Sequence, residues 1–309
     1  MKTQDPEPRR RRFVRTAEAA GPAGQRPSRS AADRCGFRIS LAEWSLHRAI
    51  QSGVLTNLEF PHVAQEHFGV EGVEFVNWMW KAPTQRYLQQ LRRNIRNAGV
   101  EAVLIMCDLE GPLGSPDPGE RAKAVENHYK WVDAAAELDC FAIRANMRPG
   151  RWRPSGPDEL RSFIGYAAES FRRLCEYARK ARVDVLIENH GGPSSNPDVV
   201  VRLVHEVNMS NFGTLPDFGN FPAGADRYDA VRRMMPFAGD VSFKCHDFAP
   251  EPEFRETHLD MDRMMKIVLD SGYRGWIGIE YSGKRLNEFE GIQAAKRYLD
   301  HFLDSLVPC

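Results

Sequence analysis

The sequence predicts a single α/β domain with the (β/α)8 barrel fold, the TIM barrel, preceded by a disordered N-terminal tail. From Phe37 onward, short apolar runs alternate with longer segments of helical periodicity. Continuous apolar runs separated by helices are typical of parallel strands that helices cover on the outside. Eight such units favour a closed barrel over an open sheet. A barrel of this kind needs about 250 residues, so the 309 residues of the chain accommodate one barrel and a tail.

The predicted strands are eight apolar runs spread over the chain. They cover residues 37–44, 72–77, 101–107, 141–146, 183–189, 212–218, 240–246 and 276–281. The segments between them have helical periodicity, most clearly after Gly156 and Pro157, where apolar residues recur at helical offsets from Leu160 to Ala178. We also expect Gly99 to end the helix that precedes the third strand.

Residues 1–35 differ from the rest of the chain. They are rich in Arg, Ala, Pro and Ser and have no apolar period, which predicts disorder, and the barrel domain then covers residues 36–309. Within this tail the run RRRFVR (10–15) resembles a twin-arginine export signal. The residues that follow are too polar for such a signal, so a degenerate signal and a solvated basic tail both stay open. We expect a cytoplasmic protein, with periplasmic export as the alternative.

The overall composition points to a small-molecule partner. Lys and Arg together number 42, as do Asp and Glu, so the formal net charge is zero. This balance supplies no field that would attract nucleic acid or an anionic membrane surface. No apolar run approaches the ~20 residues that a membrane helix needs, and a homo-oligomer stays open. The six scattered cysteines form no CxxC pair and predict reduced, mostly buried thiols.

Four side chains that can bind metals stand at the ends of the last four predicted strands. They are Glu188, Asp217, His246 and Glu280, spaced about one βα unit apart. Because functional residues of such barrels lie at the carboxyl ends of the strands, we expect all four to converge at one mouth of the barrel. Three carboxylates would repel one another without a cation. This mostly oxygen set predicts one divalent ion, with Mn²⁺ first and Mg²⁺, Co²⁺ or Zn²⁺ as alternatives.

Further candidates for substrate contact stand near the same strand ends. His190 lies two residues after the glutamate that ends the fifth strand, so both should point to the same side. Lys244 should likewise point into the barrel, where it would either bind a substrate oxygen or pair with a carboxylate of the metal site. Arg144 is a candidate as well, although it could form an interior ion pair with Glu74. The remaining candidates, each of which could instead be a packing or loop residue, are Trp44, His47 and Glu110.

Four short motifs carry a resemblance to a known family. They are IENHGG (187–192), LPDFGN (215–220), KCHDF (244–248) and GIEY (278–281). In order and register they resemble motifs of the sugar phosphate isomerase/epimerase family, the xylose isomerase-like TIM barrels, over about residues 37–305. The resemblance implies that the four strand-end residues named above bind one divalent metal ion. It also implies that Glu188 and Glu280 face each other across a sugar and move a proton at the carbon next to its carbonyl.

The sequence departs from the ketose epimerases of that family at two positions. Asn220 stands where they carry a substrate-binding His, and Pro252 stands where they carry an Arg. Asn220 is therefore counted among the candidate substrate contacts, and the identity of the sugar stays open.

The predicted function is thus a divalent-metal-dependent sugar isomerase or epimerase that acts on a small-molecule carbohydrate. The main alternative is a metal-dependent lyase or hydratase that carries out β-elimination on a keto-sugar or oxidised glycoside. A non-catalytic sugar-binding protein is a more remote alternative. An abasic-site endonuclease shares the barrel, but its multi-zinc chemistry uses many histidines at strand ends and a basic face, which this sequence lacks.

Overall fold

The computed structural model describes residues 36–251 and 253–306. The predicted tail of residues 1–35, with its resemblance to an export signal, lies outside the described residues, as does Pro252. The described part forms eight strands, each inside or overlapping a predicted run. They are β1 (Arg38–Ala42), β2 (Gly72–Val76), β3 (Glu101–Cys107), β4 (Ala142–Ala145), β5 (Asp184–Glu188), β6 (Phe212–Leu215), β7 (Val241–Cys245) and β8 (Trp276–Tyr281).

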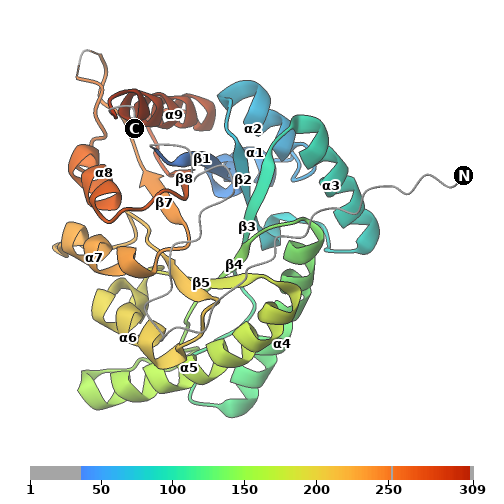
Figure 1. Ribbon diagram of the computed structural model, residues 1–309, viewed down its shortest axis with the longest axis vertical. Helices are drawn as coiled ribbons and strands as arrows, with labels where there is room; N and C mark the ends of the chain where they lie inside the picture. The colour runs from blue at the N-terminus through green and yellow to red at the C-terminus, as the bar shows by residue number, and fades with distance from the viewer. Residues whose placement is uncertain (1–35, 252, 307–309) are drawn as a thin grey trace, which may run out of the picture.

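These strands pair in parallel in the order β6-β5-β4-β3-β2-β1-β8-β7. Between β6 and β7 the pairing is reduced to two isolated parallel bridges, Thr214 with Ala238 and Asp217 with Ser242. The backbone N–H of Phe218 donates to the carbonyl of Ser242 at 3.2 Å. Asp217 therefore lies beside β7 although it follows the end of β6. The strands stand at the centre of a ring of helices (Figure 1), which confirms the predicted (β/α)8 barrel.

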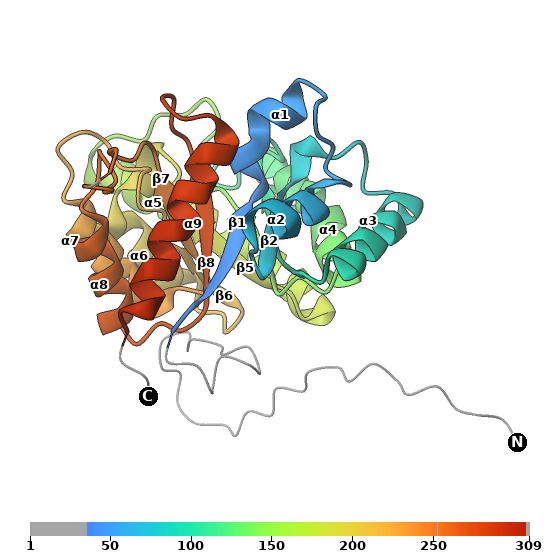
Figure 2. The ribbon, with the colours of Figure 1, turned by 90° about the horizontal axis from the view of Figure 1, so that it is seen from above.

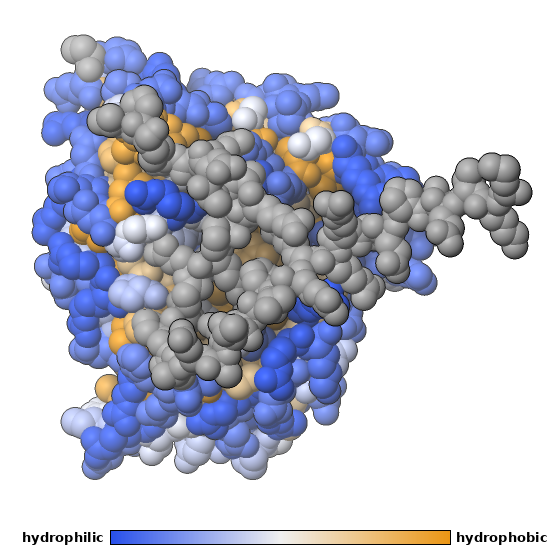
Figure 3. Space-filling view, viewed as in Figure 1, coloured by the Kyte–Doolittle hydropathy of each residue, from blue (hydrophilic) through white to orange (hydrophobic). Residues whose placement is uncertain are grey.

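The helices cover the outside of the barrel. Within the described residues they are α1 (His47–Gln51), α2 (Phe60–Phe68), α3 (Gln85–Ala98), α4 (Pro118–Glu137), α5 (Gly156–Ala181), α6 (Pro197–Val207), α7 (Arg227–Met234), α8 (Met261–Asp270) and α9 (Glu288–Asp304). The described chain begins and ends on one side of the barrel, and α1, which follows β1, lies on the opposite side (Figure 2). Hydrophilic residues dominate the rim of the face shown in Figure 3.

Two helix boundaries confirm what the sequence pattern predicts. Helix α5 follows Ser155 and turns one apolar face inward, burying Phe163, Phe171 and Leu174 among others. Helix α3 ends at Gly99, whose backbone is left-handed at φ 72°, a conformation that glycine adopts without steric cost. Such helix ends return the chain to the start of each strand, so all eight strands run in the same direction.

The interior of the barrel is not uniformly apolar. Ser40, Glu74 and Arg144 are all buried on β1, β2 and β4, and the Ser40 hydroxyl donates a hydrogen bond to the Glu74 carboxylate. Burial raises the pKa of Glu74 to about 8, against the effect of the Ser40 hydroxyl. Burying a charge without a partner is costly, so this carboxyl is held as the neutral acid at neutral pH. The polar interior leads directly to the carboxyl ends of the strands.

The close approach of a buried side chain inside the barrel explains why one position of β8 is a glycine. A Cβ on Gly278 of β8 would overlap the buried Glu74 carboxylate. We expect Gly278→Ala to lower the free energy of unfolding by about 1–3 kcal/mol, because overpacking forces the neighbouring groups to move. Gly165, on the exposed face of α5, has nothing within 4 Å of its Cβ position and is the matched control. Gly165→Ala should raise stability by about 0.5–1 kcal/mol, and urea denaturation of both variants would show the opposite signs.

The cysteines among the described residues are placed as the sequence predicts. Cys107, Cys140, Cys175 and Cys245 are buried free thiols, and burial raises the pKa of each. They act as small apolar side chains in the core. None of the helices formed by the described residues has the length and apolar character that crossing a membrane requires.

Candidate functional site

Three of the four predicted metal ligands meet at the carboxyl ends of the strands. Glu188 ends β5, Asp217 follows β6, and Glu280 lies near the end of β8. Their side chains are buried, with exposures of 2%, 0% and 6%. One carboxylate oxygen from each lies within 4.8 Å of the other two, a spacing at which they could hold a metal ion. The barrel register therefore brings together three acidic groups that are far apart in the sequence.

His246 is the predicted ligand that the structure does not bring into this group. Strand β7 ends at Cys245, and the residue of β7 whose Cα pairs with Glu280 is Lys244. His246 lies one residue beyond the strand, where the alternation of side chains no longer applies. The inward position that faces the carboxylates on β7 is therefore occupied by Lys244.

His246 belongs instead to a second group with Glu256 and His258, and these three side chains could also hold a metal ion. The centroids of the two imidazole rings are 4.7 Å apart. Glu256 is buried and accepts hydrogen bonds from the backbone N–H groups of His246, His258 and Leu259. The Glu256 carboxylate thus fixes the loop after β7, and His246 lies in this second group.

Lys244 supplies a cation to the three carboxylates. Its ammonium group donates to Glu280 Oε1 and lies 4.0 Å from Asp217 Oδ2. Burial lowers the pKa of Lys244, but Glu280 and Asp217 outweigh burial and leave it well above its ordinary value. Of the two roles that the sequence left open for this lysine, pairing with a site carboxylate is the one observed.

Arg144 supplies a second buried cation on the opposite side of the group. Its Nη1 donates to Asp108 Oδ1 at 2.7 Å. Its Nε lies 2.8 Å from Glu188 Oε2, close enough for an ion pair but without the alignment of a hydrogen bond. The predicted ion pair between Arg144 and Glu74 does not form, because Glu74 bonds to Ser40 instead. Arg144 therefore holds Glu188 in place from within the barrel.

The carboxyl groups of the site differ in their affinity for protons. Burial raises the pKa of Glu188 to about 7, although Arg144 opposes the rise. Burial raises the pKa of Asp217 to about 7 as well, against the effect of Lys244. For Glu280 burial acts in the same direction, but Lys244 outweighs it and lowers the pKa. Near neutral pH the site therefore holds both an ionised carboxylate and carboxyl groups that can carry a proton.

A single hydroxyl group lies between two of these carboxyl groups. Ser242 Oγ lies 2.9 Å from Asp217 Oδ2 and 3.2 Å from Glu280 Oε2. A hydroxyl has one proton, so it can donate to only one of these oxygens. The other contact is a hydrogen bond only if that carboxyl group is protonated. Ser242 therefore lies between Asp217 and Glu280 and links these two carboxyl groups.

The metal ion implied by the sequence can be tested against these contacts. Three carboxylates alone could share one ion, with oxygens about 2.0–2.6 Å from it. In the folded chain, however, Glu280 is already bonded to an ammonium group that also approaches Asp217. The fourth predicted ligand, His246, stands in a separate group. The residues present therefore do not fit the four-ligand metal centre that the sequence predicts.

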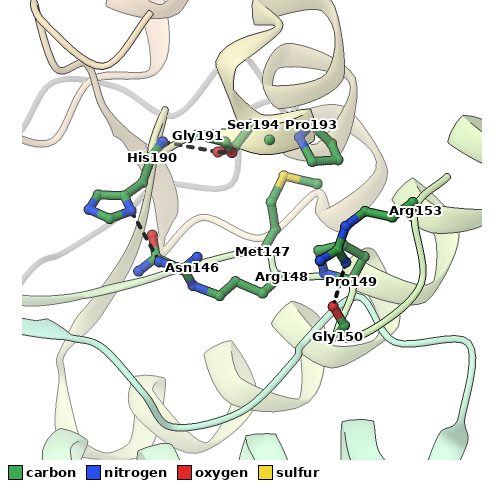
Figure 4. A pocket seen from close by; sticks show the side chains of 11 residues that line it. Asn146, Met147, Arg148, Pro149, Gly150, Arg153, His190, Gly191, Pro193 and Ser194 are labelled. Atoms are coloured by element: carbon green, nitrogen blue, oxygen red, sulfur yellow. Dashed lines mark hydrogen bonds between the residues drawn. The ribbon is translucent and has the colours of Figure 1, made fainter. Parts of the chain in front are cut away.

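Two cavities are lined by residues that follow β3, β4 and β5, and the three carboxylates are not among these residues. The larger, of about 300 Å³, is lined by residues that include Asn146, Arg148, Arg153 and His190. Figure 4 shows these side chains around the space, with Arg148 directed at His190. The smaller, of about 230 Å³, shares Asn146 and Arg148 with it and also borders Glu110. Polar and basic groups thus line the space that a small polar ligand would enter.

His190 lines the larger cavity and Asn220 contacts Glu188, and the role of both in binding a substrate stays a prediction. His190 Nδ1 is 3.2 Å from Arg148 Nη2. Burial lowers the pKa of His190, and the positive charge of Arg144 lowers it further. Asn220 Nδ2 donates to Glu188 Oε1 at 2.7 Å. The Asn220 backbone N–H donates to the carboxylate of Asp217 at 2.7 Å. Asn220 thus orients two of the three acidic groups.

The other three candidates have protein partners of their own. Trp44 and His47 stack on each other with ring centroids 4.4 Å apart, and His47 Nδ1 lies 2.7 Å from the Trp44 carbonyl. Glu110 accepts hydrogen bonds from Asn77 at 2.9 Å and from Trp131 at 2.6 Å. These contacts brace the loops at the mouth of the barrel, and Glu110 also borders the smaller of the two cavities.

Sequence reasoning missed several residues of the site. Asp108 directly follows β3 and accepts from Arg144 and from Asn146 Nδ2, both at 2.7 Å. Its place after a strand was a usable signal. Ser242 lies two residues before Lys244 on β7, so the same alternation would have found it. Arg148 lies in an irregular loop, and no sequence pattern places it.

Comparisons with known proteins agree with this architecture. The profile of the xylose isomerase-like TIM barrel family matches residues 62–302. No curated protein matches the chain. Among solved structures, an L-ribulose 3-epimerase aligns with a TM-score of 0.70 and 14% identity, over 87% of this chain and 95% of that one.

Two further structures with the same fold belong to proteins of different activities. A 3-keto-D-glucoside 4-epimerase from E. coli aligns with a TM-score of 0.65 and 16% identity, over 86% of this chain and 99% of that one. An AP endonuclease of family 2 from Brucella melitensis aligns with a TM-score of 0.64 and 20% identity, over 85% and 99%. At these identities the structures establish the fold alone. The family profile covers most of the chain, and the chain belongs to the xylose isomerase-like TIM barrel family.

Proposed function

We propose that the chain is a sugar isomerase or epimerase that moves a proton at a carbon next to a carbonyl group. The observation that carries this proposal is the pair of buried glutamates on β5 and β8. Burial raises the pKa of Glu188 to about 7, whereas Lys244 outweighs burial and lowers the pKa of Glu280. Two carboxyl groups whose pKa values are pushed apart are suited to act as acid and base. The similarity to structures of sugar epimerases supports the same substrate class.

In this proposal Glu280 is the base and Glu188 is the acid. Glu280 removes a proton from the carbon next to the carbonyl, and Glu188 returns a proton to the resulting enolate or enediolate. The ammonium group of Lys244 and the guanidinium group of Arg144 flank the two carboxylates and stabilise the negative charge that develops. His190, Arg148 and the cavity beside them would receive the hydroxyl groups of the sugar.

The sequence also predicts a divalent ion, with Mn²⁺ first, as the group that polarises the carbonyl. Such an ion supplies Lewis-acid stabilisation when it is bound. It would have to displace Lys244 from Glu280 to bind the carboxylates, and His246 would not contribute to its coordination. The proposed proton transfer uses groups that the chain itself provides.

A second candidate function is β-elimination from an oxidised glycoside. Its support is the similarity to a 3-keto-D-glucoside 4-epimerase, whose name describes a keto-sugar substrate. Both reactions begin when a base removes a proton next to a keto group. They differ in the next step, since elimination expels water or the aglycone, whereas epimerisation delivers a proton from a second group to the same carbon.

A panel of free ketoses, aldoses and 3-keto-glycosides, followed by proton NMR, tests the proposal and separates the two candidates. We expect an isomer or epimer to form with no loss of water or aglycone. Release of the aglycone would instead support elimination. A purified protein that turns over no sugar on the panel, or that incises abasic DNA instead, would contradict the proposal.

A further inference from the structure

The position on β7 that faces the carboxylates carries a lysine. Lys244 and Glu280 are direct Cα partners in the ladder between β7 and β8. The Lys244 side chain is largely buried, with 13% exposure, and its ammonium group contacts Glu280 and approaches Asp217. Each of these contacts follows from the register of the barrel and not from the conformation of a surface loop.

Charge accounts for the stability of this arrangement. Glu188, Asp217 and Glu280 lie within 4.8 Å of one another and would repel one another if all three were ionised and unpaired. Arg144 approaches the group from the side of Glu188, and Lys244 approaches it from the side of Glu280. Two buried cations and the shared Ser242 hydroxyl thus supply the compensation that a divalent ion would otherwise provide.

We propose that Lys244 is the resident cation of this site and that it replaces a divalent metal ion there. A protonated ammonium group has three N–H donors and no lone pair, so it cannot be a metal ligand. An ion bound to Glu280 and Asp217 would lie against this positive charge and would meet strong repulsion. The nearest imidazole in sequence, His246, is held in a different group by the loop that Glu256 fixes.

The inference goes beyond the proposed function, because it concerns which cation the carboxylates hold and not which sugar reacts. It predicts that a single substitution at position 244 would create a metal site. A histidine at position 244 would place a neutral ligand opposite Glu188, Asp217 and Glu280, and would complete a set of three carboxylates and one imidazole. Such a set suits Mn²⁺.

Mn²⁺ titration by calorimetry, together with metal analysis of the dialysed protein, tests the inference without any substrate. All proteins would carry His258→Ala, so that the second group cannot contribute to the stoichiometry. In this background we expect no stoichiometric Mn²⁺ binding to the parent chain. Lys244→His should gain one equivalent, and adding Glu280→Gln should remove it. Lys266→His is the matched control, because Lys266 lies exposed on α8 and its substitution should gain nothing.

Thermal unfolding gives a second readout that also reports on folding. Saturating Mn²⁺ should raise the Tm of Lys244→His by about 5 °C or more and leave the Tm of the parent and of Lys266→His unchanged. The inference is overturned if the parent chain binds one Mn²⁺ that Glu280→Gln abolishes. It is also overturned if folded Lys244→His gains no Mn²⁺. If Lys244→His fails to fold, the titration of the parent with and without Glu280→Gln decides alone.

Discussion

Replacing Glu188 with glutamine is expected to lower kcat/KM for sugar turnover by about 10²–10⁴-fold, the usual contribution of a positioned acid or base. The glutamine side chain would keep the shape of the glutamate and could still accept from Asn220, which now bonds to Glu188 Oε1 at 2.7 Å. It could not donate or accept the proton that reacts. The loss should appear in kcat, because substrate contacts elsewhere in the cavity stay in place.

The matched control is Glu66→Gln on the exposed face of α2, which should leave both constants unchanged. Circular dichroism and the Tm of both variants would show whether the fold is retained, since Arg144 loses a charged partner when Glu188 is neutralised. A Glu188→Gln enzyme that retains full activity would remove Glu188 from the mechanism and leave another group as the acid.

Arg144→Met is expected to cause the largest loss of stability, about 3–5 kcal/mol. Arg144 is buried, with Asp108 and Glu188 as partners at 2.7 and 2.8 Å. Removing one member of a buried charge network leaves the other charges uncompensated in a medium of low dielectric constant. Urea denaturation would measure the change. The control is Arg92→Met on α3, which is half-buried but has the exposed partners Glu137 and Asp139, so that its ion pairs should be worth at most about 1 kcal/mol.

The same substitution should change how stability depends on pH. Burial raises the pKa of Asp108, but Arg144 outweighs burial and lowers it from 3.8 to about 2. A carboxyl group whose pKa is lower in the folded state stabilises the fold above its unfolded pKa, and this stabilisation is lost as the pH falls through the folded value. The parent chain should therefore lose this contribution between about pH 4 and pH 2. If Arg144→Met is as stable as the parent chain and loses stability over the same acidic pH range, Arg144 does not hold this network.

Much of the fold was predictable because parallel strands buried on both faces are continuous apolar runs. That signal is local, so all eight strands could be found without knowing how they pair. The positions of Glu188, Asp217 and Glu280 followed from a second general property, the meeting of strand ends at one mouth of the barrel. Neither step required any knowledge of tertiary contacts.

The position of His246 could not be predicted in the same way. Side-chain alternation gives Lys244 and His246 the same direction only while the chain stays in the strand. Strand β7 ends at Cys245, and the backbone N–H of His246 donates to the buried carboxylate of Glu256, ten residues after His246. Strand ends are uncertain by one or two residues from sequence alone, and that uncertainty decides which residue of KCHDF faces Glu280.

The partners of buried charges were equally difficult to predict. Arg144 had several acidic candidates inside the barrel, and the sequence offered no reason to prefer Asp108 and Glu188 over Glu74. The partners of Arg144 depend on which carboxyl group is already hydrogen-bonded to a neutral side chain. Glu74 bonds to the Ser40 hydroxyl, which leaves the arginine to the groups at the strand ends.

Solvent exchange tests the central claim most directly. The sugar that the panel identifies would be incubated with the enzyme in D₂O, and the product would be analysed by mass spectrometry and NMR. Proton transfer through Glu280 and Glu188 predicts deuterium at the carbon next to the carbonyl, at a rate that falls with Glu188→Gln and not with Glu66→Gln. Turnover that leaves this carbon free of deuterium, as a direct hydride shift would, contradicts the account.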